Sequence, residues 1–233
     1  MAHLVEAPDN VAAWKAGAQH LLAHGAEVSN IVLTVGDPVE KSHSWCHRYN
    51  PKSQGARYDN VRDVANTIFP ARTYANCDTR EEFYARYGRA HDRRRHAFPG
   101  SWGTYFERLT AFGESRRNQL ENAIASMSRW TTNHRAAITL HISSPDTDGF
   151  RTRGGPCLQY IQVVCPTRES VDLVAVYRSH DYFNKTLGNL VGLGLLQQFI
   201  ANQTGRRVGG LVCHSIHAFL GAPKSTVRAL LAG

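Results

Sequence analysis

The chain is organised around Gly154-Gly155-Pro156-Cys157-Leu158-Gln159-Tyr160-Ile161-Gln162, where a Gly-Gly-Pro turn precedes a cysteine and an alternation of apolar and polar residues. Glycine and proline mark turns, and the alternation that follows predicts a strand over 158–165. A side chain at the mouth of a strand is held still and can be presented to a ligand. Cys157 is therefore a candidate nucleophile.

The segments around this stretch predict a mixture of helices and strands. Runs rich in β-branched residues predict strands over 27–35, 136–142, 158–165, 171–177 and 208–214, the last followed by a loop over 215–219. The short turn at 166–168 indicates antiparallel pairing of 158–165 with 171–177. Helical spacing predicts a helix capped by Asn10 and ended by Gly25, others over 59–69 and 115–130, and one that starts at Thr79.

A further helix over 187–203 is apolar on most of its faces and contains Gly188, Gly192 and Gly194. Each glycine costs a helix about 1 kcal/mol relative to alanine, so three of them indicate close approach of other backbone. We expect this helix to be buried at the centre of an α+β fold with a mostly antiparallel or mixed sheet.

The composition is that of an ordinary globular chain. Of its 233 residues 42% are hydrophobic and 20% are charged, so we expect a single domain over 1–233. The sequence shows neither a basic and apolar leader nor an apolar run of about 18 residues. We therefore expect a cytoplasmic protein that does not enter a membrane.

The cysteines do not follow the spacing of a disulfide framework or of a structural zinc site. They are Cys46, Cys77, Cys157, Cys165 and Cys213. His43, Cys46 and His47 lie close together, but a fourth ligand is not apparent near them. We interpret 37–60 as an irregular loop and predict no metal site.

The net charge of +8 suggests a phosphorylated or polyanionic partner. The run from Arg89 to Arg95 concentrates part of this charge, although such runs are usually solvated surface.

Four polar residues near predicted strand ends or helix starts complete a candidate site with Cys157. Arg178 and Ser179 can both donate to phosphate oxygens. The amide of Asn189 offers a donor and an acceptor, as the edge of a uracil ring requires. With the imidazole of His217, the set predicts a nucleotide site.

The order and spacing of these residues resemble the thymidylate synthases and the related pyrimidine nucleotide hydroxymethylases. The resemblance rests on Pro156-Cys157 with Gln162, on Tyr177-Arg178-Ser179-His180-Asp181-Tyr182-Phe183, on Asn189 and on His217-Ala218-Phe219. Upstream, Tyr87-Gly88 is similar to the family's Tyr-Gly-x-x-Trp, and Asn133-His134-Arg135 to its Ser-Arg-Arg. The resemblance covers most of 85–220, is thin before residue 85, and implies the family's three-layer fold.

The family resemblance also implies a reaction. The Cys157 thiolate, favoured by Arg178 nearby, would add to C6 of a pyrimidine nucleoside monophosphate such as dUMP or UMP, and C5 would then attack a folate-borne carbon. The product would carry a methyl or hydroxymethyl group at C5. The implied cofactor is 5,10-methylenetetrahydrofolate.

Individual roles follow from the same resemblance. Asn189 would read O4 and N3 of the ring, and the backbone amide of Asp181 would bind the other ring carbonyl; both are counted with Cys157 as catalytic. The substrate-binding residues would be Arg178 and Ser179 at the phosphate, His217 at a sugar hydroxyl, Gln162, and Arg135, which would reach the phosphate from the partner subunit of a homodimer.

The sequence departs from the family pattern at several positions. Phe219 stands where the family has Tyr, which removes a hydrogen bond to the sugar. His134 replaces one of the paired arginines, and His91 lies near the position of the Tyr-Gly-x-x-Trp tryptophan. The Glu-Leu-Leu-Trp-Phe-Leu segment is not found, and 63–69 is its nearest counterpart. The chain also ends at Gly233 without the family's tail, so nucleotide binding is better supported than folate use.

Other interpretations remain open. A cytidine monophosphate (CMP or dCMP) 5-hydroxymethylase is one, although a cytosine site is expected to place an acceptor such as Asp where Asn189 stands. A homologue that binds nucleotide or nucleic acid through its basic face, without one-carbon chemistry, is another. Cys157 can also be a plain core cysteine, Asn189 a helix cap, and His217 a core histidine.

Overall fold

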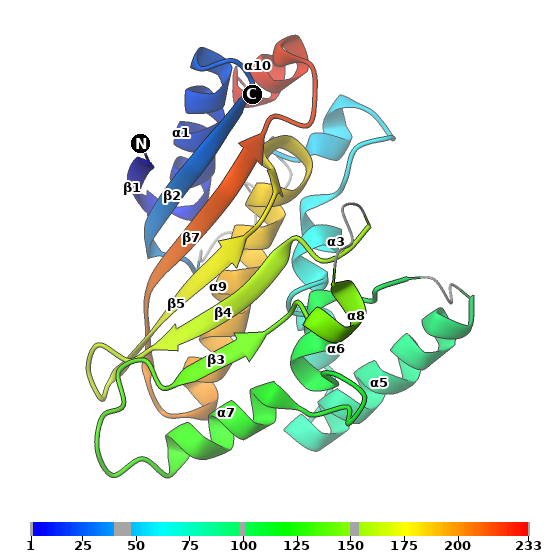
Figure 1. Ribbon diagram of the computed structural model, residues 1–233, viewed down its shortest axis with the longest axis vertical. Helices are drawn as coiled ribbons and strands as arrows, with labels where there is room; N and C mark the ends of the chain where they lie inside the picture. Colours follow the sequence, from blue (N-terminus) through cyan, green and yellow to red (C-terminus); the bar gives the residue numbers. More distant parts are fainter. Residues whose placement is uncertain (1, 40–47, 98–100, 150–153, 233) are drawn as a thin grey trace.

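The computed structural model describes residues 2–39, 48–97, 101–149 and 154–232. Within these ranges the strands form one mixed sheet in the order β1-β2-β7-β5-β4-β3, with β6 paired to β7 (Figure 1). The strands are β1 (His3–Asp9), β2 (Glu27–Asp37), β3 (Ile138–His141), β4 (Leu158–Val164), β5 (Ser170–Tyr177), β6 (His180–Asp181) and β7 (Arg207–Phe219). β4 and β5 are antiparallel, which confirms that prediction.

The helices are α1 (Asn10–Ala23), α3 (Val61–Asn66), α4 (Ala71–Tyr74), α5 (Arg80–Ala97), α6 (Tyr105–Thr110), α7 (Gln119–Ser128), α8 (Pro145–Asp148), α9 (Leu187–Gln203) and α10 (Lys224–Ala232), with short 3₁₀ and π-helical turns η1 (Pro51–Gln54) and η2 (Tyr182–Thr186). Figure 1 shows α1 and α9 behind the sheet. None of the helices in the described ranges is both long and apolar enough to cross a membrane.

α9 is the buried central helix that its composition predicts. A Cβ atom at Gly188 would lie 2.6 Å from Val64 Cβ, and one at Gly192 would lie 2.8 Å from the carbonyl oxygen of Ala65. Both neighbours belong to α3, so the glycines allow α3 to pack directly on α9. On the other side, Gln197 Nε2 donates to the carbonyl oxygen of Val171 on β5 (2.7 Å). The sheet, α9 and α3 therefore form three successive layers, and this mixed architecture agrees with the expected α+β class.

Several predicted boundaries are wrong. β7 does not end at His214 but continues through 215–219, because β2 pairs with it as far as Glu27 opposite Phe219. The helix predicted over 59–69 ends at Asn66, and the one predicted from 115 begins after Asn118, whose side chain accepts from Glu121 N.

At α1 the cap is Asp9, which accepts from Ala12 N, whereas Asn10 is the first helical residue and donates to Pro38 O (2.8 Å). β1 was not predicted, and its parallel pairing with β2 is a long-range contact that local periodicity does not reveal. The arginine run lies on α5, where Arg89, Arg93 and Arg94 are exposed. His43, Cys46 and His47 lie outside the described residues.

One face of the sheet carries no helix over its central strands (Figure 1). We call it the outer face. Strand register aligns its side chains in two rows across the sheet, namely Leu4, Val32, His214, Val176, Tyr160 and His141, and then Glu6, Thr34, Val212, Val174, Gln162 and Thr139. Leu4 is 59% exposed and Tyr160 38% exposed, so this face presents apolar side chains to the surroundings.

Candidate active site

Cys157 lies immediately before β4 and is half-buried. Two hydrogen bonds tie its turn to the end of β5: the backbone N–H of Arg178 donates to Cys157 O (2.9 Å), and Arg178 Nε donates to Pro156 O (3.2 Å). The thiol and the guanidinium predicted for one site therefore lie together. Since the backbone itself makes the contact, the positions of the two residues are coupled.

The electrostatic surroundings of Cys157 differ from the expected ones. Burial raises the pKa of the Cys157 thiol, and this effect outweighs the lowering by Arg178 and Lys185, while the Asp181 carboxylate raises the pKa further. Arg178 thus acts in the predicted direction, but the net shift favours the neutral thiol. The surroundings of Cys157 in the structure therefore disfavour its thiolate near neutral pH.

Tyr105 is a residue of this site that sequence reasoning missed. Burial raises the pKa of Tyr105, so its hydroxyl stays a neutral phenol, and the backbone of Leu158 and Cys157 lies close enough to this hydroxyl to offset part of the shift. Tyr87, which belongs to the segment that resembles the family's Tyr-Gly-x-x-Trp, is hydrogen-bonded to Thr104 Oγ1 (2.5 Å). The sequence does contain a signal for a helix that begins at Tyr105, because Thr104 and Glu107 have the spacing of a capping box. In the structure Glu107 N donates to Thr104 Oγ1 (3.1 Å), and α6 starts at Tyr105.

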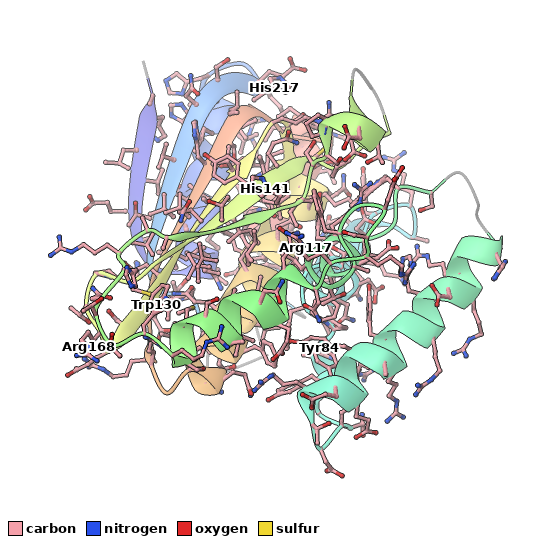
Figure 2. The ribbon with its side chains drawn as sticks, turned by 60° about the horizontal axis from the view of Figure 1, so that its bottom comes forward. Tyr84, Arg117, Trp130, His141, Arg168 and His217 are labelled. Atoms are coloured by element: carbon pink, nitrogen blue, oxygen red, sulfur yellow. The ribbon has the colours of Figure 1, made fainter. Side chains whose placement is uncertain are left out.

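Ser179 and His217 meet where β6 joins β7. Ser179 Oγ lies 3.3 Å from His217 Nδ1, and His217 Nε2 lies 3.7 Å from Glu27 Oε2 on β2. Figure 2 shows His217 at one end of the sheet. A hydroxyl and an imidazole that adjoin Arg178 in this way provide donors for phosphate and sugar oxygens.

Asn189 lies inside the first turn of α9 and is not its cap, because Thr186 occupies the cap position. Its Nδ2 donates to His180 Nε2 (3.0 Å), and His180 Nδ1 lies 2.9 Å from Ser215 Oγ. All three side chains are buried. His180 is thus a second residue that the sequence analysis did not select, because its partners come from α9 and β7.

The carboxylate of Asp181 has a structural role. It caps η2 by accepting from Phe183 N (3.1 Å) and Asn184 N (2.9 Å), and it also accepts from Asn184 Nδ2 (2.8 Å). Burial raises the pKa of Asp181, partly offset by these hydrogen bonds. Its fixed position holds the chain between Ser179 and α9.

Gln162 and Arg135 lie away from Cys157 within the chain. The Gln162 amide faces β3, with Nε2 donating to Ile138 O (2.7 Å) and Oε1 accepting from Thr139 Oγ1 (2.8 Å). Gln162 lies five positions after Cys157, which corresponds to about 16 Å along a strand. Arg135 is exposed, and its carbonyl accepts from Cys165 N (2.7 Å) beyond the far end of β4. Figure 2 shows Trp130 and Arg168 at that end, opposite His217.

A cavity of about 470 Å³ opens between α3 and α9. It is lined by Asn60, Arg62, Asp63, Ala65, Asn66, Ala71, Arg72, Val191 and Leu195. A second hollow of about 230 Å³ shares Asp63, Asn66 and Arg72 with it and adds Arg94 and Tyr87. Asp59 precedes the lining residue Asn60, and its Oδ2 atom forms an ion pair with Lys185 Nζ (2.7 Å). Lys185 is in turn close enough to Cys157 to lower the pKa of the thiol. Among the described residues, no cluster of His, Cys, Asp and Glu side chains is arranged to hold a metal ion.

No protein-family model matches the chain. Two archaeal proteins, each described as "Putative thymidylate synthase", are similar to it. The protein from Methanothermobacter thermautotrophicus is 26% identical over 235 residues, which cover 94% of this chain and 94% of the relative. The protein from Methanothermobacter marburgensis is 26% identical over 196 residues, which cover 83% of this chain and 77% of the relative. These similarities support a distant relationship to the thymidylate synthases.

Proposed function

We propose that the protein transfers a one-carbon unit to C5 of a uridine monophosphate, in the ribo or deoxyribo form. The observation that carries the proposal is the contact between the turn before β4 and the segment after β5, which brings Cys157 beside Arg178 and Ser179, while Asn189 on α9 bonds His180 of the same segment. The two distant relatives described as thymidylate synthases support the same class of reaction.

In the proposed reaction the sulfur of Cys157 forms a bond to C6 of the ring, and C5 gains the electron pair that attacks the one-carbon donor. The C5 proton then leaves, and the bond between the transferred carbon and its donor breaks as that carbon takes up a hydride for a methyl product or water for a hydroxymethyl product. Breaking of the C6–S bond releases the nucleotide and regenerates the thiol. The bound nucleotide brings a phosphate to Arg178 and Ser179, and Tyr105 holds the backbone of Cys157 and Leu158 in place during the addition. Asn189 pairs with the ring edge, and the Asp181 amide and His217 bind the second carbonyl and the sugar.

The proposed place for the folate cofactor that the resemblance implies is the cavity between α3 and α9, whose lining residues do not include Cys157, Arg178 or Asn189. Its amides and carboxylate, from Asn60, Asn66 and Asp63, can pair with the donors and acceptors of a pterin. Arg72 and Arg94 lie along the adjoining hollow and match the carboxylates of a glutamate tail. When bound there, 5,10-methylenetetrahydrofolate would supply the one-carbon unit and, for a methyl product, the hydride as well.

The proposed enzyme is a homodimer in which Arg135 serves the partner's site. Arg135 lies at the opposite end of β4 from Cys157, so it can reach a phosphate near Arg178 only in a second copy of the chain. The outer face of the sheet is the proposed contact, because it places an uncovered apolar surface between these two ends.

Release of tritium from nucleotide labelled at C5 tests the proposal, because thiol addition at C6 loosens the C5 proton whichever product forms. We expect release that requires Cys157, and Cys157→Ala should reduce it by at least about 10³-fold while nucleotide binding persists. Cys77→Ala provides the matched control, since Cys77 is also half-buried but lies after α4. Full release by the Cys157→Ala protein would contradict the proposal.

Addition of methylenetetrahydrofolate separates the proposed transferase from a protein that only binds nucleotide. Release in the presence of folate with formation of a C5-substituted nucleotide supports one-carbon transfer. Nucleotide binding without release, with or without folate, would instead support the non-catalytic interpretation.

A further inference from the structure

A buried histidine connects the proposed base-reading residue to the sheet. His180 is 1% exposed, and its two ring nitrogens contact Asn189 Nδ2 (3.0 Å) and Ser215 Oγ (2.9 Å). The ring stacks on Tyr177, with 4.0 Å between centroids and 3° between planes. Neither the nucleotide roles proposed above nor the thiol chemistry uses this imidazole.

The chemistry of the contacts fixes the hydrogen-bond direction along the chain. Burial lowers the pKa of His180 to about 3, so the ring is neutral near pH 7 and carries one N–H. An amide nitrogen only donates, so Nε2 must be the bare nitrogen that accepts from Asn189. Nδ1 then carries the hydrogen and donates to Ser215 Oγ, whose own hydrogen can point to Tyr182 Oη at 3.4 Å.

This direction determines how the Asn189 amide lies. If the amide were turned over, its oxygen would face Nε2, which would then need a hydrogen, and Ser215 would have to donate to Nδ1. The stacked Tyr177 ring also prevents His180 from turning aside. The orientation of the amide is therefore coupled to the tautomer of His180, because each tautomer of the ring allows only one orientation of the amide.

Uracil and cytosine present inverse patterns to such an amide. Uracil carries an N–H at position 3 and a carbonyl at position 4, whereas cytosine carries a bare ring nitrogen and an amino group there. A restrained amide can pair fully with only one of them in a given pose. We infer that His180, held by Ser215, sets the preference between uracil and cytosine nucleotides by fixing the orientation of the Asn189 amide. This inference rests on the proposed function, in which Asn189 reads the base.

Dissociation constants for UMP and CMP, and for their deoxy forms, test the inference. We expect the wild-type protein to prefer one base by about 10- to 100-fold. His180→Leu removes the restraint, so the ratio should fall below about threefold. Ser215→Ala keeps the imidazole but removes the acceptor of Nδ1–H, and should lower the ratio as well. This milder substitution tests the same inference if the His180→Leu protein does not fold.

Tyr177→Phe is the control, because it preserves the stacked ring and removes only a hydroxyl that makes no hydrogen bond within the described residues. Its base preference should equal that of the wild-type protein. An unchanged ratio in both His180→Leu and Ser215→Ala would overturn the inference while leaving the proposed function intact. Binding of neither base by the wild-type protein would overturn both.

The tautomer can be measured without any nucleotide. In ¹⁵N NMR spectra of histidine-labelled protein, assigned by comparison with Ser215→Ala and His180→Leu, we expect His180 to carry its hydrogen on Nδ1 and to have a bare Nε2. A hydrogen on Nε2 would overturn the inference, because the amide oxygen of Asn189 would then have to face the ring.

Discussion

At the scale of single residues, the central question is how the half-buried thiol of Cys157 could serve as the nucleophile of the proposed reaction. The pKa of Cys157 is raised in the free protein because burial outweighs the attraction of Arg178 and Lys185. A reactive cysteine usually lies in a more electropositive environment. The surroundings of Cys157 therefore favour the neutral thiol in the free protein.

Alkylation of Cys157 by iodoacetamide should accordingly be slow at pH 7 to 8 and should accelerate as the pH rises above 9, because the thiolate is the reacting form. Lys185→Met removes a cation that lowers the pKa, so it should move this profile to higher pH. Peptide-level mass spectrometry distinguishes Cys157 from Cys77, which serves as the internal reference. A Cys157 rate already maximal at pH 7 would contradict the prediction.

His180 provides a second prediction, on acid stability. Its folded-state pKa of about 3 lies below the unfolded value of about 6.5, so between these pH values the unfolded chain binds a proton that the folded protein does not. The stability that His180 contributes is therefore present above pH 6.5 and is lost as the pH falls toward 3, at up to about 1.4 kcal/mol per pH unit. Urea unfolding of wild-type protein and His180→Leu at several pH values measures the difference in slope. If the free energy of unfolding depended on pH in the same way for the two proteins, the prediction about His180 would be wrong.

Tyr105 should act through position and not through its proton. Tyr105→Phe removes the polar contact of the hydroxyl with the backbone of Cys157 and Leu158, and the loss of such a contact in a buried site costs about 1–3 kcal/mol. We expect a fall of about 10- to 100-fold in the rate of tritium release, with nucleotide affinity nearly unchanged. Tyr87→Phe should have a small effect, since its hydroxyl bonds Thr104 away from the thiol. Equal losses in both variants would argue against this role.

At the scale of elements, the sequence is most informative where a residue type has few explanations. Three glycines in an apolar helix predict close packing, and α3 lies against two of them. Motif spacing predicts a single site from five residues, namely Cys157, Arg178, Ser179, Asn189 and His217. Tyr105 and His180 were missed, because each acts through partners distant in sequence. The same limit applies to β1 and to the end of β7, whose pairing with β2 no local pattern encodes.

The packing of α3 on α9 makes Gly192 sensitive to substitution. A Cβ there would lie 2.9 Å from Ile68 Cβ and 2.8 Å from Ala65 O, so Gly192→Ala should destabilise the protein by about 1–3 kcal/mol. Gly88 is the control on α5, where a Cβ would have no neighbour within 4 Å. Gly88→Ala should stabilise by about 0.5–1 kcal/mol through helix propensity. Thermal unfolding of both variants gives the sign of the change in stability. An increase in stability for Gly192→Ala would contradict the close packing of α3 on α9.

At the scale of the whole molecule, the two ends of the sheet carry different parts of the proposed site. Cys157 and His217 lie at one end and Arg135 at the other, and the uncovered outer face lies between them. Gln162 belongs to this face, where its amide is bonded to β3. Sequence similarity can suggest that Arg135 serves a phosphate, but only the fold shows that one chain cannot bring it there.

A shared site predicts recovery of activity when two inactive proteins are mixed. Arg135→Ala should lose most activity because the phosphate loses a charge-assisted partner, and Cys157→Ala loses the nucleophile. After unfolding and refolding an equal mixture, about half of the symmetric dimers should be hybrids with one intact site of two, which gives about a quarter of wild-type activity. Sedimentation establishes that dimers form, and each variant refolded alone is the control. Hybrid dimers without recovered activity would show that Arg135 does not serve the partner's site, and a monomer at all concentrations would remove the outer face as the contact.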